Sequence, residues 1–193
     1  MKIAIDIDDT LVLHRTRDVK FTLEFAKANN LDFEFVNGKD MTKGIKINWT
    51  SELYEKFWTS SFGKNFYKYA SISNQNKQII KTLQKRGHEI FFITARNPKW
   101  QEITQNWLKK NELDVELVFS DKKGQFCLEN GIEILIDNDP EICENARELG
   151  VRTFHFDSTN KQFHKNTLND LLKITKTGED DEKQNFSTVE RVL

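Results

Sequence analysis

The chain has 193 residues, a formal net charge of −1, and charged residues of both signs that make up 31% of its length. Because it has no basic excess, it lacks the charge balance of a general nucleic-acid binder, and no apolar run approaches the roughly 20 residues of a transmembrane helix. A chain of this length can bury about 70% of the surface that its unfolded form exposes, so it needs no disulfide framework. Cys127 and Cys143 are widely spaced and have no paired histidines nearby, which argues against a zinc site. The opening residues lack a signal-peptide layout, so we expect a cytoplasmic protein with no membrane partner.

Short apolar segments alternate with helical patterns through most of the chain. We expect buried strands, rich in β-branched and aromatic residues, at 2–7, 88–94, 115–120, 132–136 and 151–156. Helices are expected between and after them at 74–86, 98–110, 123–130 and 140–150. Pro98 and Pro140 open two of these helices, and Gly87 closes the first. The alternation predicts an α/β fold with a Rossmann-like parallel sheet covered by helices.

Two segments break this alternation. Residues 15–73 are too many for one crossover and carry helical patterns such as FTLEFAKA and SELYEKFW, so we expect a small, mostly helical cap inserted after the first strand. The catalytic core would then comprise residues 1–14 and 74–175. Residues 176–193 include the acidic run EDDE and are expected to form a flexible tail.

Polar and charged residues gather where the expected strands end. The first strand runs into Asp6-Ile7-Asp8-Asp9-Thr10, the second into Thr94-Ala95-Arg96, the third into Asp121-Lys122-Lys123, and the fourth into Asp137-Asn138-Asp139. Any one of these segments alone would be a solvated turn or a helix cap. Because ligands bind at the carboxyl ends of the strands in open α/β sheets, the four together predict one polar pocket.

The residue types in this pocket suit phosphoryl transfer. Asp6 and Asp137 could share a hard divalent cation, and oxygen ligands of this kind suit magnesium. Such a cation would relieve the repulsion among closely spaced carboxylates. Asp6 could attack phosphorus and form an aspartyl-phosphate, while Asp8 could protonate the leaving group and then deprotonate water. Lys123 could neutralise charge on Asp6 and on the phosphate.

Phosphate-binding groups are expected directly after the second strand. Thr94 and the backbone amides that follow it, at Ala95 and Arg96, could bind the phosphoryl oxygens. Two interpretations of the Arg96 side chain stay open, namely a contact with substrate and a structural ion pair.

In the order and spacing of these four motifs, residues 1–156 resemble the haloacid dehalogenase (HAD) superfamily of phosphohydrolases. The span ITARNPKWQEITQNWLKKN, with the small helical cap, resembles the bacterial branch related to 5'(3')-deoxyribonucleotidases. The resemblance implies a Rossmann-like sheet, Mg²⁺ as the cofactor, Asp6 as the nucleophile and Asp8 as the acid/base. It also implies that Asp6, the backbone carbonyl of Asp8, and Asp137 bind the metal.

Three details depart from the family pattern or leave a choice. Asp9 stands where many relatives have glycine. Asn138 separates Asp137 from Asp139, whereas many relatives have adjacent carboxylates, so a role for Asp139 at the metal stays open. Lys122 is the alternative to Lys123 as the motif lysine.

The inserted cap bears on the choice of substrate, because a lid that closes over the site favours small molecules. Its many aromatic residues offer flat faces for a nucleobase, although most of them are expected to form the core of the cap. We therefore expect a phosphatase of small phosphate esters, with nucleoside monophosphates foremost. Sugar phosphates and nucleic-acid 3'-ends are alternative substrates. A non-catalytic binding protein on this fold is a further alternative, against which the presence of both Asp6 and Asp8 argues.

Overall fold

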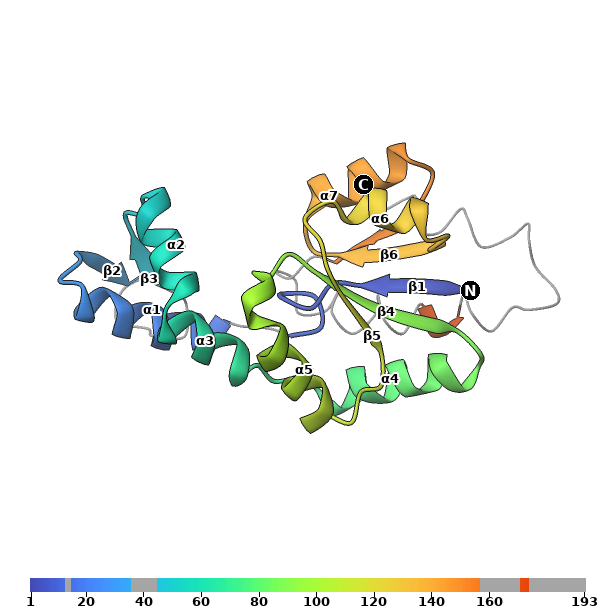
Figure 1. The fold of residues 1–193 in the computed structure, drawn as a ribbon, viewed down its shortest axis with the longest axis horizontal. Helices are drawn as coiled ribbons and strands as arrows, with labels where there is room; N and C mark the ends of the chain where they lie inside the picture. The colour runs from blue at the N-terminus through green and yellow to red at the C-terminus, as the bar shows by residue number, and fades with distance from the viewer. Residues whose placement is uncertain (13–14, 36–44, 157–170, 174–193) are drawn as a thin grey trace.

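A sheet of five parallel strands forms the centre of the protein (Figure 1). The computed structural model describes residues 1–12, 15–35, 45–156 and 171–173, with the backbone alone described for 15–18. The strands are β1 (Lys2–Ile5), β4 (Glu89–Thr94), β5 (Glu116–Phe119), β6 (Ile134–Asp137) and β7 (Arg152–His155). They lie in the order β5-β4-β1-β6-β7, and every neighbouring pair is parallel. The α/β fold with a parallel sheet that the sequence predicts is confirmed.

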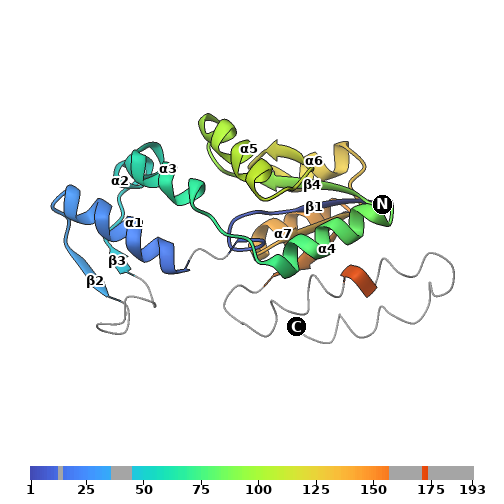
Figure 2. The same ribbon diagram turned by 90° about the horizontal axis from the view of Figure 1, so that it is seen from below.

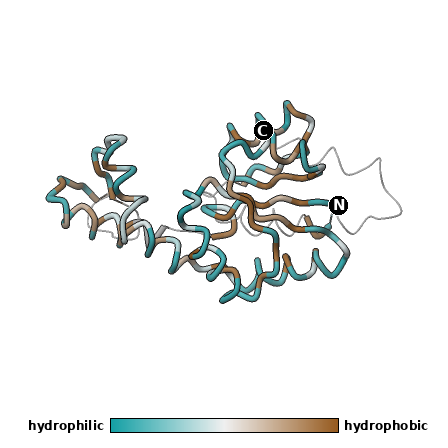
Figure 3. Tube along the Cα trace, in the orientation of Figure 1, coloured by the Kyte–Doolittle hydropathy of each residue, from teal (hydrophilic) through white to brown (hydrophobic). Residues whose placement is uncertain are grey.

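Helices cover both faces of this sheet. On one face, α4 (Asn74–Lys85) and α5 (Gln101–Lys110) pack against strand residues such as Ile3 and Ile5. On the other face, α6 (Lys123–Glu129) and α7 (Pro140–Glu148) pack against the neighbouring position Ala4. Because successive strand residues point to opposite faces, an uninterrupted apolar strand such as β1 requires this double cover. The tube coloured by hydropathy shows the same pattern, with apolar strands inside and more polar helices around them (Figure 3).

The helices begin and end at the residues that their sequence signals indicate. The Ser73 side chain accepts a hydrogen bond from the Asn76 amide at 3.0 Å and caps α4. Gly87, just beyond the end of α4, has a φ of +80°, which glycine adopts without strain. Pro98 opens a short 3₁₀ turn, η1 (Pro98–Trp100), that leads into α5, and Pro140 opens α7.

Three helices and a pair of short strands lie between β1 and α4. They are α1 (Arg15–Ala28), β2 (Phe33–Phe35), β3 (Ile45–Ile47), α2 (Ser51–Thr59) and α3 (Ser61–Lys68). Phe21, Phe25, Phe57, Phe66 and Tyr67 form a separate aromatic core among them. The antiparallel β2–β3 pair was not expected, because three-residue strands are too short to show a two-residue periodicity. We refer to residues 15–73 as the cap, and we propose these residues as its boundaries.

The cap lies to one side of the sheet (Figure 2), and it contacts the core at η1 and α5. The indole of Trp107 donates to the carbonyl of Ala70 at 2.8 Å, and the indole of Trp100 donates to the carbonyl of Trp58 at 2.8 Å. Aromatic residues of α5 and η1 therefore tie the end of the cap to the sheet domain.

One expectation concerns a part of the chain that the structure does not describe. The proposed acidic tail, 176–193, lies beyond the described residues. Among the helices that are described, none is both long enough and apolar enough to cross a membrane.

Candidate active site

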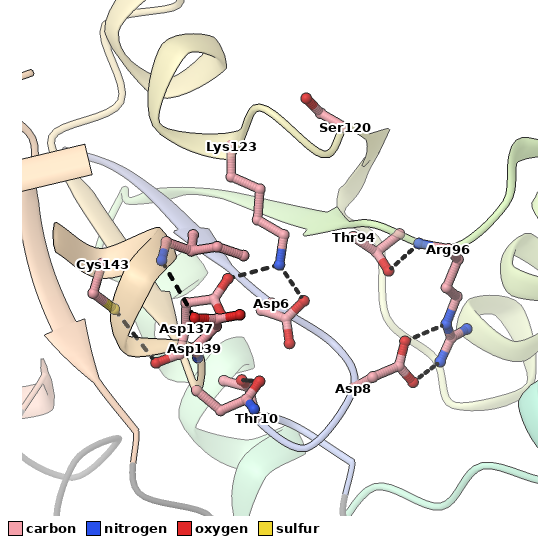
Figure 4. Close-up of polar contacts among 12 residues, drawn as sticks. Asp6, Asp8, Thr10, Thr94, Arg96, Ser120, Lys123, Asp137, Asp139 and Cys143 are labelled. Atoms are coloured by element: carbon pink, nitrogen blue, oxygen red, sulfur yellow. Dashed lines mark hydrogen bonds and ion pairs between the residues drawn. The ribbon is translucent and has the colours of Figure 1, made fainter. Parts of the chain in front are cut away.

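The expected polar residues meet at the carboxyl end of the sheet (Figure 4). Asp6 directly follows β1, Thr94 ends β4, Asp137 ends β6, and Lys123 opens α6 after β5. All four side chains are buried. Parallel pairing brings strand ends from distant parts of the sequence to one edge, so the fold itself assembles this group.

Lys123 joins two carboxylates at the centre of the site. Its Nζ donates to Asp6 Oδ1 at 2.7 Å and to Asp137 Oδ2 at 2.6 Å. Burial alone would lower the pKa of Lys123, but the two carboxylates raise it above its ordinary value, so the ammonium stays charged. Lys122, the alternative from the sequence, is exposed at the N-cap of α6. The geometry therefore singles out Lys123.

A close helix contact fixes where Lys123 enters the site. A Cβ placed on Gly124 would lie 2.9 Å from the Cα of Ala146 in α7, which is closer than real Cβ contacts. Glycine at this position lets α6 approach α7 tightly enough for the preceding lysine to reach the strand ends.

Burial and two neighbouring carboxylates disfavour the ionised form of Asp6 more than the Lys123 ammonium favours it. Burial, together with the Asp137 and Asp8 carboxylates, raises the pKa of Asp6 to about 7 against the lowering effect of Lys123. Such a group is stabilised in its ionised form by an additional cation. Oxygen donors of this kind are the ligands that Mg²⁺ prefers, so the residues fit a magnesium ion.

Asp8 does not point toward Lys123 but pairs with Arg96. The guanidinium donates from Nε to Asp8 Oδ2 and from Nη2 to Asp8 Oδ1, both at 2.7 Å. The Arg96 side chain is 1% exposed and that of Asp8 is 28% exposed. Within the described ranges, no three aspartate, glutamate, histidine or cysteine side chains lie close enough together to hold a metal ion by themselves. The resemblance assigns only the backbone carbonyl of Asp8 to the metal, so this side-chain pairing is compatible with it.

A tight loop follows Asp6 and contains Asp8. The amides of Leu11 and Val12 donate to the carbonyl of Ile7 at 3.0 and 2.9 Å, and Asp9 has a φ of +57°. Aspartate is among the few side chains that tolerate this left-handed conformation. Asp9 thus occupies a position whose backbone suits the glycine found in many relatives.

Thr94 is placed as a hydroxyl donor at the end of β4. Its Oγ1 accepts a hydrogen bond from the Arg96 amide at 3.2 Å, which leaves the hydroxyl hydrogen for another acceptor. Ala95, the next residue, is exposed. Binding of phosphate by Thr94, Ala95 and Arg96 stays a prediction.

Asp139 has a structural task. Its Oδ1 accepts from the amides of Glu141 and Ile142 at 2.9 and 3.4 Å, so it caps α7. Its own amide donates to Asp137 Oδ1 at 2.9 Å and holds that carboxylate in place. The backbone amide of Asp139 therefore holds the Asp137 carboxylate, while the exposed side chain of Asp139 caps α7.

Sequence reasoning missed the surroundings of Arg96. Tyr67 of the cap lies under the guanidinium, with the Arg96 Cζ 4.3 Å from the ring centroid, and Trp107 lies at 6.0 Å. Thr104 Oγ1 accepts from Arg96 Nη1 at 3.2 Å. Nothing in the sequence spacing of Thr104 and Trp107 indicates an arginine contact, and Tyr67 is one of the cap aromatics, most of which are expected to form the core of the cap.

A family model described as "Protein of unknown function (DUF2608)" matches residues 1–132. The chain belongs to the DUF2608 family. The DUF2608 chain is also 29% identical over 140 residues to "Putative nucleotidase BH1399" of Halalkalibacterium halodurans, an alignment that covers 71% of this chain and 69% of that one.

Solved structures show which fold this DUF2608 member has. It superposes on a protein named as a predicted phosphoglycolate phosphatase of Haemophilus somnus 129PT with a TM-score of 0.59 and 17% identity, covering 90% of this chain and 96% of that one. It superposes on the magnesium complex of a HAD family enzyme of Bacteroides thetaiotaomicron with a TM-score of 0.52 and 16% identity, covering 86% and 98%. The fold is that of the HAD family hydrolases, as the sequence resemblance implies.

Proposed function

We propose that this protein hydrolyses phosphomonoesters through an aspartyl-phosphate, with Mg²⁺ as its cofactor and nucleoside monophosphates as its substrates. The observation that carries the proposal is the buried Lys123 ammonium, bound to Asp6 at 2.7 Å and to Asp137 at 2.6 Å at the ends of the strands. A lysine between two carboxylates offers positive charge where a phosphoryl group would arrive. The named phosphatase and nucleotidase relatives support the same class of reaction.

The proposed roles follow from the position of each group. A carboxylate oxygen of Asp6 attacks phosphorus, the ester bond to the leaving oxygen breaks, and Asp8 gives that oxygen its proton. Asp8 then takes a proton from the water that hydrolyses the aspartyl-phosphate and restores Asp6. The Thr94 hydroxyl donates to a phosphoryl oxygen, and Lys123 offsets the charge that the phosphate brings.

Asp6, Asp137 and the backbone carbonyl of Asp8 are the groups proposed to hold Mg²⁺. The bound ion would screen the phosphoryl oxygens from the Asp6 carboxylate. The raised pKa of Asp6 and the all-oxygen donor set support the choice of a hard divalent cation. A HAD family enzyme with this fold was crystallised as a magnesium complex.

The nucleotide proposal rests on the cap, because the catalytic groups handle only the phosphoryl group. Of the described cap aromatics, five are buried and four are partly buried, and the exposed ones are Trp49, Tyr54 and Tyr69. Tyr69 is the candidate for stacking on a base, since it lines a hollow of about 430 Å³ between α3 and α5 together with Trp100 and Trp107.

The same hollow favours one alternative substrate, a nucleic-acid 3'-end. Its lining includes Lys64, Lys68, Lys99 and Lys110 but only one acidic residue, Glu102. A chain with a net charge of −1 thus has a local basic surface beside aromatic rings, which suits a phosphodiester backbone.

A phosphate-release screen of the full chain tests these proposals. Nucleoside monophosphates, sugar phosphates and a 3'-phosphorylated oligonucleotide are compared with and without Mg²⁺, and Asp6→Asn serves as the inactive control. We expect the highest kcat/KM for a nucleoside monophosphate. A higher kcat/KM for the oligonucleotide or for a sugar phosphate selects that substrate instead, and no turnover of any ester contradicts the phosphatase proposal.

A further inference from the structure

All three nitrogens of the Arg96 guanidinium have hydrogen-bond partners. Nε and Nη2 donate to Asp8, and Nη1 donates to the hydroxyl of Thr104 on α5. Thr104 Oγ1 in turn donates to the carbonyl of Trp100 at 3.0 Å, so its acceptor position is fixed. The two planar hydrogen bonds to Asp8 also set the orientation of that carboxylate, because a bidentate pair allows little rotation.

The flat face of the guanidinium rests on the cap. Tyr67 belongs to α3, and its ring centroid lies 4.3 Å from Arg96 Cζ. The ring is itself fixed by Trp58, which stacks on it at 5.2 Å with an interplanar angle of 16°, and by Phe66 edge-on at 5.6 Å. An arginine over an aromatic face gains electrostatic attraction that grows when water is excluded, and here both side chains are buried.

This contact joins the cap to the arginine that pairs with Asp8. Tyr67 comes from the cap, Asp8 from the loop after β1, and Arg96 from the end of β4. The ring face of Tyr67 makes the described contact with the guanidinium, and its hydroxyl also interacts electrostatically with Arg96 and Asp8. Removing that ring would leave a gap beside the Arg96 guanidinium and weaken its hold on the orientation of the Asp8 carboxylate.

We propose that Tyr67 is a positioning residue, which holds Arg96 from the cap so that Arg96 aims the Asp8 carboxylate at the leaving group. This inference rests on the proposed phosphatase function and adds to it a cap residue that never touches the reacting atoms. It makes proton delivery by Asp8 depend on the cap being seated against α5. The consequence is selective, because only esters whose leaving oxygen needs a proton depend on the aim of Asp8.

The test compares Tyr67→Leu with the conservative Tyr67→Phe on two kinds of ester. The first is the best nucleoside monophosphate from the screen, whose alkoxide must be protonated; the second is p-nitrophenyl phosphate, whose leaving group departs unprotonated. We measure kcat/KM, which reports the steps through departure of the leaving group. Tyr67→Leu should lower kcat/KM about 10- to 100-fold for the nucleotide and less than about 3-fold for p-nitrophenyl phosphate, while Tyr67→Phe restores both.

Equal losses on the two esters would overturn the proposal. If Arg96→Lys also lowers kcat/KM equally for both esters, the result would assign the Tyr67–Arg96 pair to phosphate binding. Phe35→Leu, which removes a partly buried cap aromatic whose described ring contact is with Phe33, controls for general effects on the cap and should change neither value. A thermal unfolding midpoint for each variant separates loss of fold from loss of activity.

A crystal structure of Tyr67→Leu gives a readout that needs no turnover. The proposal requires the bidentate Asp8–Arg96 pair to be lost or rotated in Tyr67→Leu and kept in Tyr67→Phe; an unchanged pair in both variants overturns it. If the wild type hydrolyses neither ester, the phosphatase proposal fails while this structural comparison still decides the positioning by Tyr67.

Discussion

Lys123 and Asp137, which come from the start of α6 and the end of β6, form a buried ion pair of 2.6 Å. The same ammonium lies 2.7 Å from Asp6, so one positive charge pairs with two buried carboxylates. Removing one partner of a buried pair leaves an uncompensated charge, which is the costly part of such an arrangement.

Lys123→Met should therefore lower both stability and activity. We expect the free energy of unfolding to fall by about 3 kcal/mol in chemical denaturation, and phosphatase activity to fall to the level of the Asp6→Asn protein. The matched control is Lys122→Met at the adjacent exposed position, which should change the free energy of unfolding by less than about 0.5 kcal/mol. Equal effects of the two substitutions would contradict the assignment of Lys123.

The two carboxylates of the first motif should fail in different ways. Asp6→Asn should abolish turnover and leave no acid-stable or trapped phosphoenzyme, because no nucleophile remains. Asp8→Asn should lose roughly 10²–10⁴-fold in kcat/KM for alkyl phosphates, the usual scale of general acid–base catalysis, and less for p-nitrophenyl phosphate. Detection of a phosphoenzyme in Asp6→Asn by mass spectrometry would rule out Asp6 as the nucleophile.

Metal removal should stop the reaction. Chelation with EDTA is expected to abolish phosphate release, and excess Mg²⁺ is expected to restore it. Asp137→Asn should raise the Mg²⁺ concentration needed for half-maximal activity by at least about 10-fold, a change measured by titrating activity with Mg²⁺.

Asp139→Asn is the matched control for Asp137→Asn, because asparagine also caps a helix and should leave the Mg²⁺ requirement unchanged. Full activity after exhaustive chelation would contradict the metal proposal. A similar rise in the Mg²⁺ requirement for Asp139→Asn would move that carboxylate into the metal site.

If a nucleobase stacks on the cap, Tyr69 is the ring to remove. Tyr69→Ala should lower kcat/KM for nucleoside monophosphates about 10-fold, in line with the contribution of one stacked ring, and leave p-nitrophenyl phosphate nearly unchanged. Tyr54→Ala, at an exposed aromatic that does not line the hollow, is the control. A Tyr69→Ala protein that handles nucleotides as well as the wild type does would exclude this residue as the base platform.

The two cysteines should be unreactive while the protein is folded. Burial raises the pKa of Cys127 to about 11 and that of Cys143 to about 12, with nearby Asp137 adding to the rise in both. Thiolate is the reactive form and is scarce below the pKa, so alkylation by iodoacetamide at pH 8 should be much slower in native than in urea-unfolded protein. Mass spectrometry of the two samples checks this, and rapid native labelling of either cysteine would contradict it.

The sequence by itself determined the fold class and which strand-end residues lie close together. Uninterrupted apolar strands separated by helices can be buried only as a doubly covered parallel sheet, and parallel strands bring their carboxyl ends together. Asp6, Thr94 and Asp137 could therefore be assigned to one pocket from their positions just after, or at the ends of, strands. The start of α7 at Pro140 and the end of α4 before Gly87 were equally readable, because caps and breakers act over a few residues.

Only the tertiary structure decided how these side chains pair. The choice of Lys123 over Lys122 depends on where α6 begins and on the contact of Gly124 with Ala146, which joins two helices. The pairing of Arg96 with Asp8, 88 residues away, and the seat of Arg96 on Tyr67 depend on the packing of the cap against α5. Periodicity and capping report local preferences along one segment, whereas these contacts arise from the mutual burial of segments far apart in the chain, which no local pattern encodes.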